Sequence, residues 1–366
     1  MHPEYGEDRA ACCRLTEMKI QENVALAPLT TLGIGGPARW FVEAATETEI
    51  VDAVRWAKER TLPLFVLGGG SNLLVADAGF TGLVLHVALK GTETAEESGC
   101  IIYRVAAGEE WDGFVEKTVQ VNCAGVECLA GIPGTIGGTP VQNVGAYGQE
   151  VAETIQRVRV LDLERLEFVE MTAAECGFAY RTSIFNSTAR GRFLVTRVDY
   201  RLRPGGAANL RYADLQKAFA PGSSPTLVEV AEAVRRIRQG KGMLIVQGDA
   251  DCRSAGSFFK NPIVGMEQFA ELTARLGQEP PRYPAGDGRV KLPAAWLIEQ
   301  AGFSKGFVLG RAGISSRHTL ALINKGNATA ADLLTLRDVI VAGVGAKFGI
   351  ALEMEPVMLG FQAGGI

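Results

Sequence analysis

The chain has 366 residues, of which 47% are hydrophobic and 21% are charged, and this composition excludes wholesale disorder and a membrane-embedded protein. Its net charge of −4 at pH 7 gives no reason to expect a nucleic-acid partner, because proteins that bind nucleic acids usually carry a basic face. Seven cysteines without a CxxC pair and only three histidines predict neither a disulfide framework nor a metal site.

The first 20 residues are polar and predict a flexible leader. They lack the apolar core of a signal peptide, and no later run approaches the ~20 apolar residues that a membrane-spanning helix needs. We therefore expect a cytoplasmic protein that binds neither membranes nor nucleic acids.

Strands and one helix alternate in the pattern up to about residue 110. Thr46 and Glu49 form a capping box at the start of a helix over 46–61, with Ile50, Val54 and Ala57 on one face. The short apolar runs that predict strands are 30–44, 62–75, 80–89 and 100–108. In such an arrangement the loops at strand ends carry the ligands.

The middle of the chain begins with a long irregular segment, 128–148, which holds six glycines and two prolines and predicts a functional loop or a helix entry. A hairpin over 156–171 and a half-exposed strand over 193–203 follow. Segments 203–209 and 220–225 are candidate linkers, and we place the main domain boundary at the second, before a helix over 226–241.

The last third predicts helices over 266–276, 294–302 and 329–349. Thr329 and Asp332 suit the first turn of the final helix, and Gly349 suits its end. A strand over 350–359 would then place Glu353 and Glu355 on one face.

Three glycine-rich loops, 33–36, 68–72 and 131–138, offer bare backbone amides that could wrap a pyrophosphate. A glycine turn explains any one of them. Three in one chain favour a dinucleotide, although none spells G-x-G-x-x-G and no P-loop is present.

The polar candidates also have ordinary explanations when each is taken alone. Tyr180 and Arg181 fit a surface arginine over a packed aromatic ring, and Tyr212 fits a helix face. Lys241 fits the cationic end of a helix, and the run 254–257 fits a turn or a cap.

These motifs, taken together and in order, resemble the UDP-N-acetylenolpyruvoylglucosamine reductase family, flavoenzymes of bacterial peptidoglycan precursor synthesis. The resemblance covers about Thr30 to Gly360 and rests on TLGIGGPA, GGGSNLL, GIPGTIGG with QNVGAYG, YRTSIF, GSFFKNP and LEME. The tyrosine of LRYADL resembles the longer variety of the family, in which a tyrosine loop folds over the substrate.

The resemblance implies an α+β protein: a FAD-binding fold of the vanillyl-alcohol oxidase type in two subdomains, plus a smaller α+β C-terminal substrate domain. We expect the flexible leader at 1–20, the FAD-binding subdomains at 21–90 and 91–222, and the substrate-binding domain at 223–366. The last strand of that domain is expected to be able to pack back on the FAD domain.

It also implies a cytoplasmic, monomeric enzyme. This enzyme would be a flavin-dependent oxidoreductase, UDP-N-acetylmuramate dehydrogenase, with non-covalent FAD and with NADPH as hydride donor. Hydride would reach the terminal carbon of the enolpyruvyl group, and Ser257 would protonate the neighbouring carbon as general acid. Arg181 and Glu355 would stabilise the developing charge. Glu355 could hold a proton or orient the substrate carboxylate, and Lys260 or Lys241 could lower the proton affinity of the serine.

Residue matching implies further contacts. Lys241 and Asn261 would bind the substrate diphosphate and carboxylate, Tyr212 would close over the uridine nucleotide, and Asn143 would share a loop with Tyr147 near the flavin. The expected substrate contacts are Tyr147, Tyr180, Tyr212, Lys241 and Asn261. The expected cofactor contacts are Gly33, Gly35, Gly68, Gly69, Gly70, Ser71, Asn72, Gly131, Gly134, Gly137 and Gly138.

Two other functions fit part of the pattern. An oxidase or dehydrogenase of the same wider flavin fold would act on a hydroxy acid or a sugar, and GSFFKNP with the late LEME argues against it. A flavin or nucleotide-sugar binding module would explain the glycine loops but not the serine, arginine and glutamate.

Overall fold

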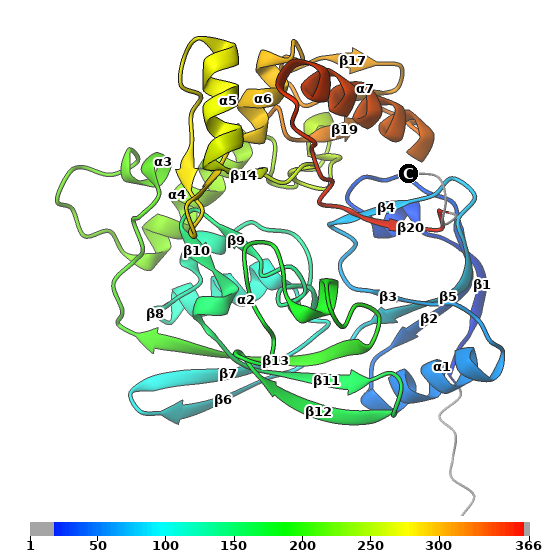
Figure 1. Ribbon diagram of the computed structural model, residues 1–366. Helices are drawn as coiled ribbons and strands as arrows, with labels where there is room; N and C mark the ends of the chain where they lie inside the picture. Colours follow the sequence, from blue (N-terminus) through cyan, green and yellow to red (C-terminus); the bar gives the residue numbers. More distant parts are fainter. Residues whose placement is uncertain (1–17, 362–366) are drawn as a thin grey trace, which may run out of the picture.

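The computed structural model describes residues 18–361, so the predicted leader over 1–20 lies almost wholly outside the described residues. A four-stranded sheet forms the first unit of the fold (Figure 1). β5 pairs in parallel with β2 and β3, and β1 pairs antiparallel with β2. In spatial order its strands are β1 (Gln21–Ala25), β2 (Pro37–Ala44), β5 (Phe80–Val87) and β3 (Leu64–Leu67).

Helix α1 (Glu47–Glu59) covers this sheet and begins as predicted. Thr46 accepts a hydrogen bond from the Glu49 amide, and the Glu49 carboxylate accepts one from the Thr46 amide, so the capping box is confirmed. The predicted apolar face of α1 is buried.

A second, antiparallel sheet holds the centre of the chain. The predicted hairpin over 156–171 is confirmed as β11 and β12, which pair from Arg157 with Thr172 to Asp162 with Glu167. In spatial order the strands are β12 (Glu167–Thr172), β11 (Ile155–Asp162), β13 (Phe193–Pro204), β7 (Cys100–Ala106) and β6 (Thr92–Glu97), and β8 (Cys123–Ala124) pairs with the end of β13.

The inner face of the second sheet carries helices α2 (Trp111–Gln120) and α4 (Leu227–Gly240). Aromatic packing joins α2 to β13, since the rings of Phe114 and Tyr200 have centroids 5.0 Å apart. Helix α2 was not among the predicted elements. Helix α4 starts with the predicted cap, but it packs with α2 in the core of the second sheet, whereas we had expected it to open the C-terminal domain.

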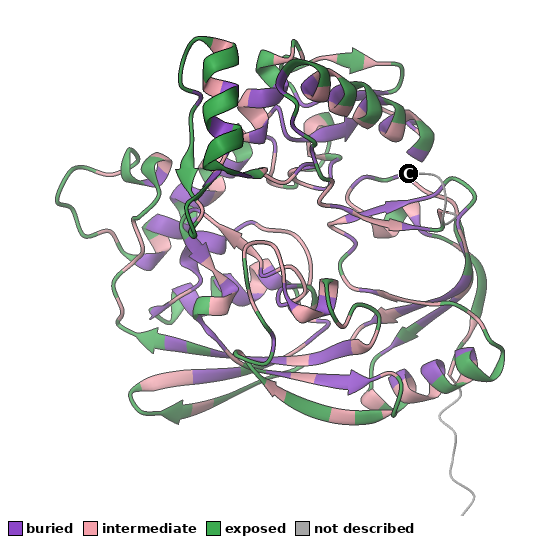
Figure 2. Cartoon of the chain, in the orientation of Figure 1, coloured by how far each residue is buried: buried purple, intermediate pink, exposed green. Residues whose placement is uncertain are grey.

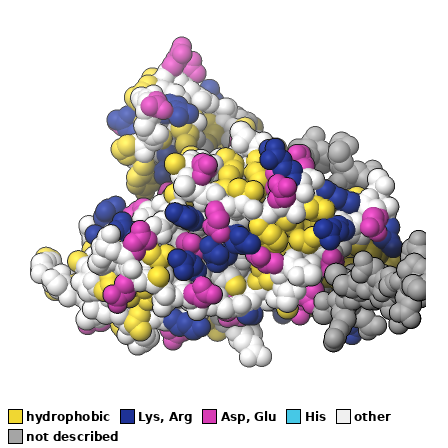
Figure 3. All heavy atoms as spheres, turned by 90° about the horizontal axis from the view of Figure 1, so that it is seen from below, with side chains coloured by type: hydrophobic (Ala, Val, Ile, Leu, Met, Phe, Trp, Pro, Cys, Tyr) yellow, Lys and Arg dark blue, Asp and Glu magenta, His cyan; other side chains and the backbone are white. Residues whose placement is uncertain are grey.

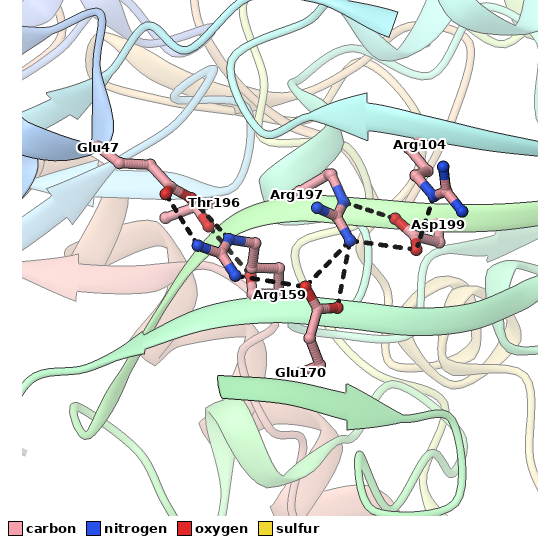
Figure 4. A network of polar contacts seen from close by, with 7 residues as sticks. All are labelled: Glu47, Arg104, Arg159, Glu170, Thr196, Arg197 and Asp199. Carbon is pink, nitrogen blue, oxygen red and sulfur yellow. Dashed lines mark hydrogen bonds and ion pairs between the residues drawn. The ribbon is translucent and has the colours of Figure 1, made fainter. Parts of the chain in front are cut away.

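The outer face of the second sheet bears a ladder of ion pairs instead of helices (Figure 4). Arg159 bridges Glu47 of α1, at 2.9 Å, and Glu170 of β12, at 3.4 Å. Basic and acidic side chains are interspersed over this side of the molecule (Figure 3), so the face has no extended field of one sign. The ladder comprises Glu47, Arg104, Arg159, Glu170, Thr196, Arg197 and Asp199.

The predicted half-exposed strand is β13, and it differs from the prediction in one respect. On one face Leu194, Thr196, Val198, Tyr200 and Leu202 are buried, as a half-exposed strand requires, but Val195 and Asp199 on the other face are buried as well. The reason is that β13 lies between β11 and β7, and Arg197 and Arg104 cover the Asp199 carboxylate. The edge strands β6 and β12 are the exposed ones (Figure 2).

The C-terminal part has its own hydrophobic cluster and lies above the two sheets in Figure 1. The three helices predicted there are confirmed, and Thr329 and Asp332 form a capping box on the last. Its elements are β14 (Ile263–Gly265), α5 (Met266–Leu276), β15 (Tyr283–Pro284), β16 (Arg289–Lys291), α6 (Ala294–Gln300), β17 (Val308–Leu309), β18 (Ala312–Ile314), β19 (Leu322–Asn324) and α7 (Ala330–Phe348).

The chain then returns to the first unit through strand β20 (Val357–Leu359), which pairs in parallel with β4 (Leu73–Val75) (Figure 1). The predicted strand over 350–359 is therefore mostly wrong, because regular pairing is limited to its last three residues. The Val357 amide donates to the Asn72 carbonyl, but the Glu355 amide donates to the Phe258 carbonyl instead, so the ladder does not extend back beyond Val357.

Short elements complete the connections. The predicted irregular segment 128–148 is confirmed as irregular, with only one-turn helices and strands of two residues. The remaining elements are η1 (Ala27–Leu29), η2 (Glu127–Leu129), η3 (Ile136–Gly138), β9 (Gly145–Ala146), β10 (Gln149–Glu150), η4 (Val151–Glu153), η5 (Ile184–Asn186), α3 (Ala213–Gln216) and η6 (Ala250–Cys252).

Among residues 18–361, no helix combines the length and the apolar character that crossing a bilayer requires. Nor does the described part of the chain gather three or more His, Cys, Asp or Glu side chains in a way that could hold a metal ion.

Candidate active site

A cavity of about 1350 Å³ lies where loops of the two sheets meet the C-terminal part. It is larger than the 300–1,000 Å³ of ordinary small-molecule pockets, so it has room for more than one ligand. Its walls come from segments far apart in the chain, including 64–73, 132–150, 180–195 and 354–358.

Two of the glycine loops pack against each other in the wall of this cavity. A Cβ on Gly69 would lie 2.6 Å from the Cα of Gly134, and a Cβ on Gly68 would lie 2.8 Å from Oγ1 of Thr135. Gly70 has φ +60°, and a Cβ there would lie 1.8 Å from the carbonyl oxygen of Leu29. The contact between the loops therefore already requires these glycines, before any ligand is considered.

Gly138 is different, because a Cβ there would meet no protein atom within 4 Å. It lines the cavity at the end of η3. The bare backbone at this position faces open space, so this is where a ligand could approach the chain closely.

Not all predicted cofactor contacts lie in the cavity wall. Gly68, Gly69, Gly70, Ser71, Asn72, Gly134, Gly137 and Gly138 line it. Of the residues described, Gly33, Gly35 and Gly131 lie outside the lining. A Cβ on Gly35 would lie 2.4 Å from the Cβ of Val75, and the Gly131 carbonyl accepts a hydrogen bond from Arg238 Nε at 3.0 Å, so these two positions serve packing.

Arg181 and Glu355 meet inside the cavity, with Nε and Oε1 3.3 Å apart. The Arg181 guanidinium also donates to the carbonyl oxygen of Gly145 at 2.6 Å. Arg181 has φ +54°, a left-handed conformation that is uncommon for a non-glycine residue and marks strain at functional sites.

Burial raises the pKa of the Glu355 carboxyl above its ordinary value, and the positive charges of Arg181 and Lys260 oppose that rise. The two acids of the LEME motif thus have different surroundings. The Glu353 side chain is 76% exposed and pairs with Lys260 at 3.2 Å, whereas that of Glu355 is 15% exposed.

Ser257 lines the cavity and is followed by the buried Phe258 and Phe259. The Phe258 carbonyl accepts a hydrogen bond from the Glu355 amide at 2.9 Å, so the serine segment and the glutamate segment run side by side. The structure thus brings Ser257, Arg181 and Glu355 to one cavity.

The tyrosine loop forms another part of the wall. The rings of Tyr147 and Tyr212 meet edge to face, with centroids 5.3 Å apart. The Lys241 Nζ lies 5.7 Å from the centroid of Tyr147 and 3.0 Å from Asp214 Oδ2. Burial alone would lower the pKa of Lys241, but the hydrogen bond that it donates to Asp214 and the nearby Tyr147, Tyr212 and Asp214 groups together raise the pKa.

Asn261 and Tyr180 link the C-terminal part to the second sheet. Asn261 Nδ2 lies 3.5 Å from the Tyr180 hydroxyl, and its Oδ1 accepts the Ala294 amide at 2.9 Å. Both residues line the cavity. Asn143 lies outside the lining: it is buried and donates to Glu150 at 2.8 Å, although its loop, which also carries Tyr147, lines the cavity.

Four cationic or imidazole side chains in the lining were not predicted as site residues: Arg190, Arg238, Lys291 and His318. Lys291 Nζ lies 4.4 Å from the ring centroid of Tyr180, and burial, aided by Arg181, lowers its pKa. Burial also lowers the pKa of His318, to about 4. Their positions in the sequence carry no periodic signal that would have identified them.

Comparison with known proteins agrees with this geometry. Residues 248–359 match the family model of the UDP-N-acetylenolpyruvoylglucosamine reductase C-terminal domain, and residues 38–169 match that of an FAD binding domain. UDP-N-acetylenolpyruvoylglucosamine reductase from Thermobifida fusca is 49% identical, over 92% of this chain and 97% of its own. The same-named protein of Streptomyces coelicolor is 48% identical, over 92% and 89%.

A solved structure is similar over nearly the whole chain. The crystal structure of UDP-N-acetylenolpyruvylglucosamine reductase from Thermus caldophilus aligns with a TM-score of 0.62 and 28% identity, covering 93% of this chain and 99% of that one. The fold expected from the sequence, a FAD-binding part followed by an α+β C-terminal part, is confirmed.

Proposed function

This chain belongs to the UDP-N-acetylenolpyruvoylglucosamine reductase family, and on that basis we propose that it reduces the enolpyruvyl group of UDP-N-acetylglucosamine enolpyruvate. The product is UDP-N-acetylmuramate, a precursor of bacterial peptidoglycan. The enzyme is a flavin-dependent oxidoreductase that uses FAD and NADPH. The observation that carries the proposal is the convergence of Ser257, Arg181 and Glu355 in a cavity walled by glycine loops.

FAD, when bound, carries hydride from NADPH to the terminal carbon of the enolpyruvyl group. The described residues fit this cofactor: the loops at 68–72 and 134–138 turn backbone towards the cavity, and Gly138 leaves open space. Backbone amides of such loops suit a pyrophosphate. A volume of about 1350 Å³ leaves room for a substrate beside it.

Ser257 supplies the proton. As hydride adds to the terminal carbon, negative charge develops on the neighbouring carbon and spreads into the substrate carboxylate. The Ser257 hydroxyl gives its hydrogen to that neighbouring carbon, so one hydride and one proton complete the saturated product. The serine is regenerated by a proton from solvent.

Arg181 stabilises the developing negative charge, because a guanidinium in a site shielded from water interacts strongly with a carboxylate. Glu355 holds Arg181 in place through the contact of 3.3 Å. Burial also raises the pKa of Glu355, and the pH test given below distinguishes this orienting role from one in which Glu355 holds a proton.

The tyrosine loop binds the nucleotide end. Lys241, positioned by Asp214 and flanked by the rings of Tyr147 and Tyr212, contacts the diphosphate. Tyr212 is 41% exposed and closes over the uridine. Asn261 and Tyr180 bind near the carboxylate end, and Lys291 adds a cation there. We further propose that the protein is a cytoplasmic monomer.

Spectroscopy and turnover test the proposal. The purified protein should be yellow and should oxidise NADPH only when the enolpyruvyl sugar nucleotide is supplied. Turnover with dioxygen in place of the sugar nucleotide would indicate an oxidase of the wider flavin fold. A protein that binds flavin or the sugar nucleotide without turnover would indicate a binding module.

A further inference from the structure

Asn72 joins the glycine loop of the first unit to the segment that carries Glu355. Its side-chain Nδ2 donates to Gln142 Oε1 at 2.6 Å and to the backbone carbonyl oxygen of Glu355 at 3.2 Å. Its own backbone carbonyl accepts the Val357 amide at 3.0 Å. Two hydrogen bonds therefore connect residue 72 to the chain on both sides of Pro356.

Both donors of the Asn72 amide group are used by the protein. A side-chain amide has two N–H hydrogens, and Gln142 and Glu355 accept one each. The Nδ2 group thus has no hydrogen left for a ligand. Our sequence-based prediction made Asn72 a cofactor contact, and these bonds give its side chain a different task.

The peptide groups on either side of Glu355 are fixed by different parts of the fold. Its amide donates to the Phe258 carbonyl at 2.9 Å, beside Ser257, and its carbonyl accepts from Asn72. Its carboxylate contacts Arg181 at 3.3 Å. Because the Glu355 amide is bonded to the Phe258 carbonyl, it does not pair with β4. The ladder between β20 and β4 therefore starts only at Val357, and Asn72 holds the carbonyl that the ladder does not reach.

We propose that Asn72 is a positioning residue for Glu355: through the bond to the Glu355 carbonyl it sets the place of that carboxylate relative to Arg181 and Ser257. This inference rests on the proposed function of the site. The bond links the loop at 68–72, which lines the cofactor's side of the cavity, to Glu355 on the substrate's side.

The variant Asn72→Asp tests this, since it keeps the size of the side chain but loses both donors and turns an oxygen towards the Glu355 carbonyl. We expect reduction of the bound flavin by NADPH to stay within about twofold of wild type and the FAD dissociation constant within about threefold. Reoxidation of the flavin by the sugar nucleotide should slow about 10- to 100-fold, and its pH profile should shift because Glu355 moves.

Two comparison variants separate the alternatives. Ser71→Ala changes the neighbouring residue in the lining, and as a cofactor contact it should weaken FAD binding instead. Gln142→Leu removes the other partner of Asn72 but keeps the bond to Glu355, so it should slow reoxidation less than Asn72→Asp does.

Hydrogen exchange of the FAD-free protein gives a readout independent of turnover. The segment 353–359 should exchange faster in Asn72→Asp than in wild type, while the rest of the cavity wall stays unchanged. Unchanged exchange there, or a loss of FAD affinity with a normal reoxidation rate at saturating FAD, would overturn the inference. If wild-type flavin is not reoxidised by the sugar nucleotide, the proposed function fails, and exchange still decides the role of Asn72.

Discussion

Arg181 and Glu355 form an ion pair in which the guanidinium favours the ionised form of a buried carboxyl. Burial alone would favour the neutral form of Glu355, and the guanidinium 3.3 Å away opposes that. The strained φ of +54° at Arg181 and its bond to the Gly145 carbonyl hold the guanidinium there. The pair is therefore sensitive to pH.

Glu355→Gln should change how stability depends on pH. A carboxyl whose pKa is raised in the folded state destabilises the fold at pH values above its pKa in the unfolded chain. The wild-type free energy of unfolding should therefore fall as pH rises from about 4.5 through the folded pKa. Glutamine does not titrate, so the variant should gain stability relative to wild type across this window. Denaturant unfolding at a series of pH values measures the difference.

Glu353→Gln is the matched control for that experiment, because it removes an exposed carboxylate from the same segment. It should not reproduce the pH-dependent gain. A parallel measurement of flavin reoxidation decides the role of Glu355: if it holds a proton, the rate should fall above its pKa in wild type, whereas an orienting role predicts the loss below that pKa.

Ser257→Ala should separate the two half-reactions. The hydroxyl is needed only when the substrate carbon is protonated, so reduction of the flavin by NADPH should remain at the wild-type rate. Reduction of the sugar nucleotide should fall by about 10²–10⁴-fold. Stopped-flow absorbance of the flavin follows both steps, and an equal loss in both would contradict the role of the serine.

His318 should stay neutral well below the pH at which histidines usually titrate. Burial, with Lys241 next, lowers its pKa to about 4. Its Nδ1 lies 3.1 Å from the Leu320 amide and accepts that hydrogen, so Nε2 carries the proton. Nitrogen NMR should find one neutral tautomer at pH 6, and an imidazolium signal there would contradict this.

The lowered pKa of His318 predicts that the free energy of unfolding depends on pH in the direction opposite to that predicted for Glu355. Below its ordinary pKa of 6.5 the histidine takes up a proton on unfolding but not in the folded state, so stability should fall as pH drops from 6.5 towards 4. The free energy of unfolding should change by at most roughly 1.4 kcal/mol per pH unit, which corresponds to the uptake of one proton. His318→Gln should flatten this pH dependence in urea unfolding curves.

Gly138→Ala should weaken FAD binding, whereas Gly70→Ala should destabilise the fold. The added methyl at 138 meets no protein atom within 4 Å, so the FAD-free protein should unfold as wild type does while FAD binds at least about tenfold more weakly. The methyl at 70 would lie 1.8 Å from the Leu29 carbonyl oxygen, and positive φ adds about 1–3 kcal/mol of strain, so that protein should be destabilised without any cofactor. Calorimetry and flavin fluorescence distinguish the two, and normal FAD affinity in Gly138→Ala would mean that the cofactor does not approach there.

Asp214→Asn should weaken nucleotide binding through Lys241. The carboxylate holds the Lys241 ammonium at 3.0 Å and anchors the tyrosine loop to the end of α4, so its loss should raise KM for the sugar nucleotide about 10-fold with a smaller change in kcat. Lys217 pairs with the same aspartate at 3.6 Å but is 77% exposed. Lys217→Ala should therefore leave KM nearly unchanged, and equal effects of the two variants would argue against the anchor.

Much of the fold was predictable because its signals are local. The capping residues of α1 and α7, Thr46 and Thr329, and the apolar periodicity behind them need no tertiary context. Helix α2 escaped prediction even though it packs on the second sheet, since it has no side-chain cap hydrogen bond and a glycine at position 113. The strand over 350–359 was overextended because the Glu355 amide bonds to the Phe258 carbonyl, a tertiary contact that no local pattern encodes, and pairing with β4 begins only at Val357.

The site was predictable mainly through family resemblance. Nothing in the periodicity around Arg181 or Ser257 indicates a catalytic role. Only the family motifs YRTSIF and GSFFKNP indicated it. The glycine loops show the limit of pattern reading, because Gly68 to Gly70 are required by a neighbouring loop as well as by any ligand. Lys291 and His318 reach the cavity only through the packing of the C-terminal part, which no local pattern encodes.

The pairing of β20 with β4 has a consequence for how the protein is made. Val357 and Leu73 are partners in that pairing, so the ribosome delivers one of them long after the other. A nascent chain in which the glycine loops and Ser257 have already left the ribosome still lacks Glu355. The site therefore stays incomplete until the segment around residues 355–359 has been made, and premature stop codons upstream of residue 355 should yield protein that is inert towards the sugar nucleotide.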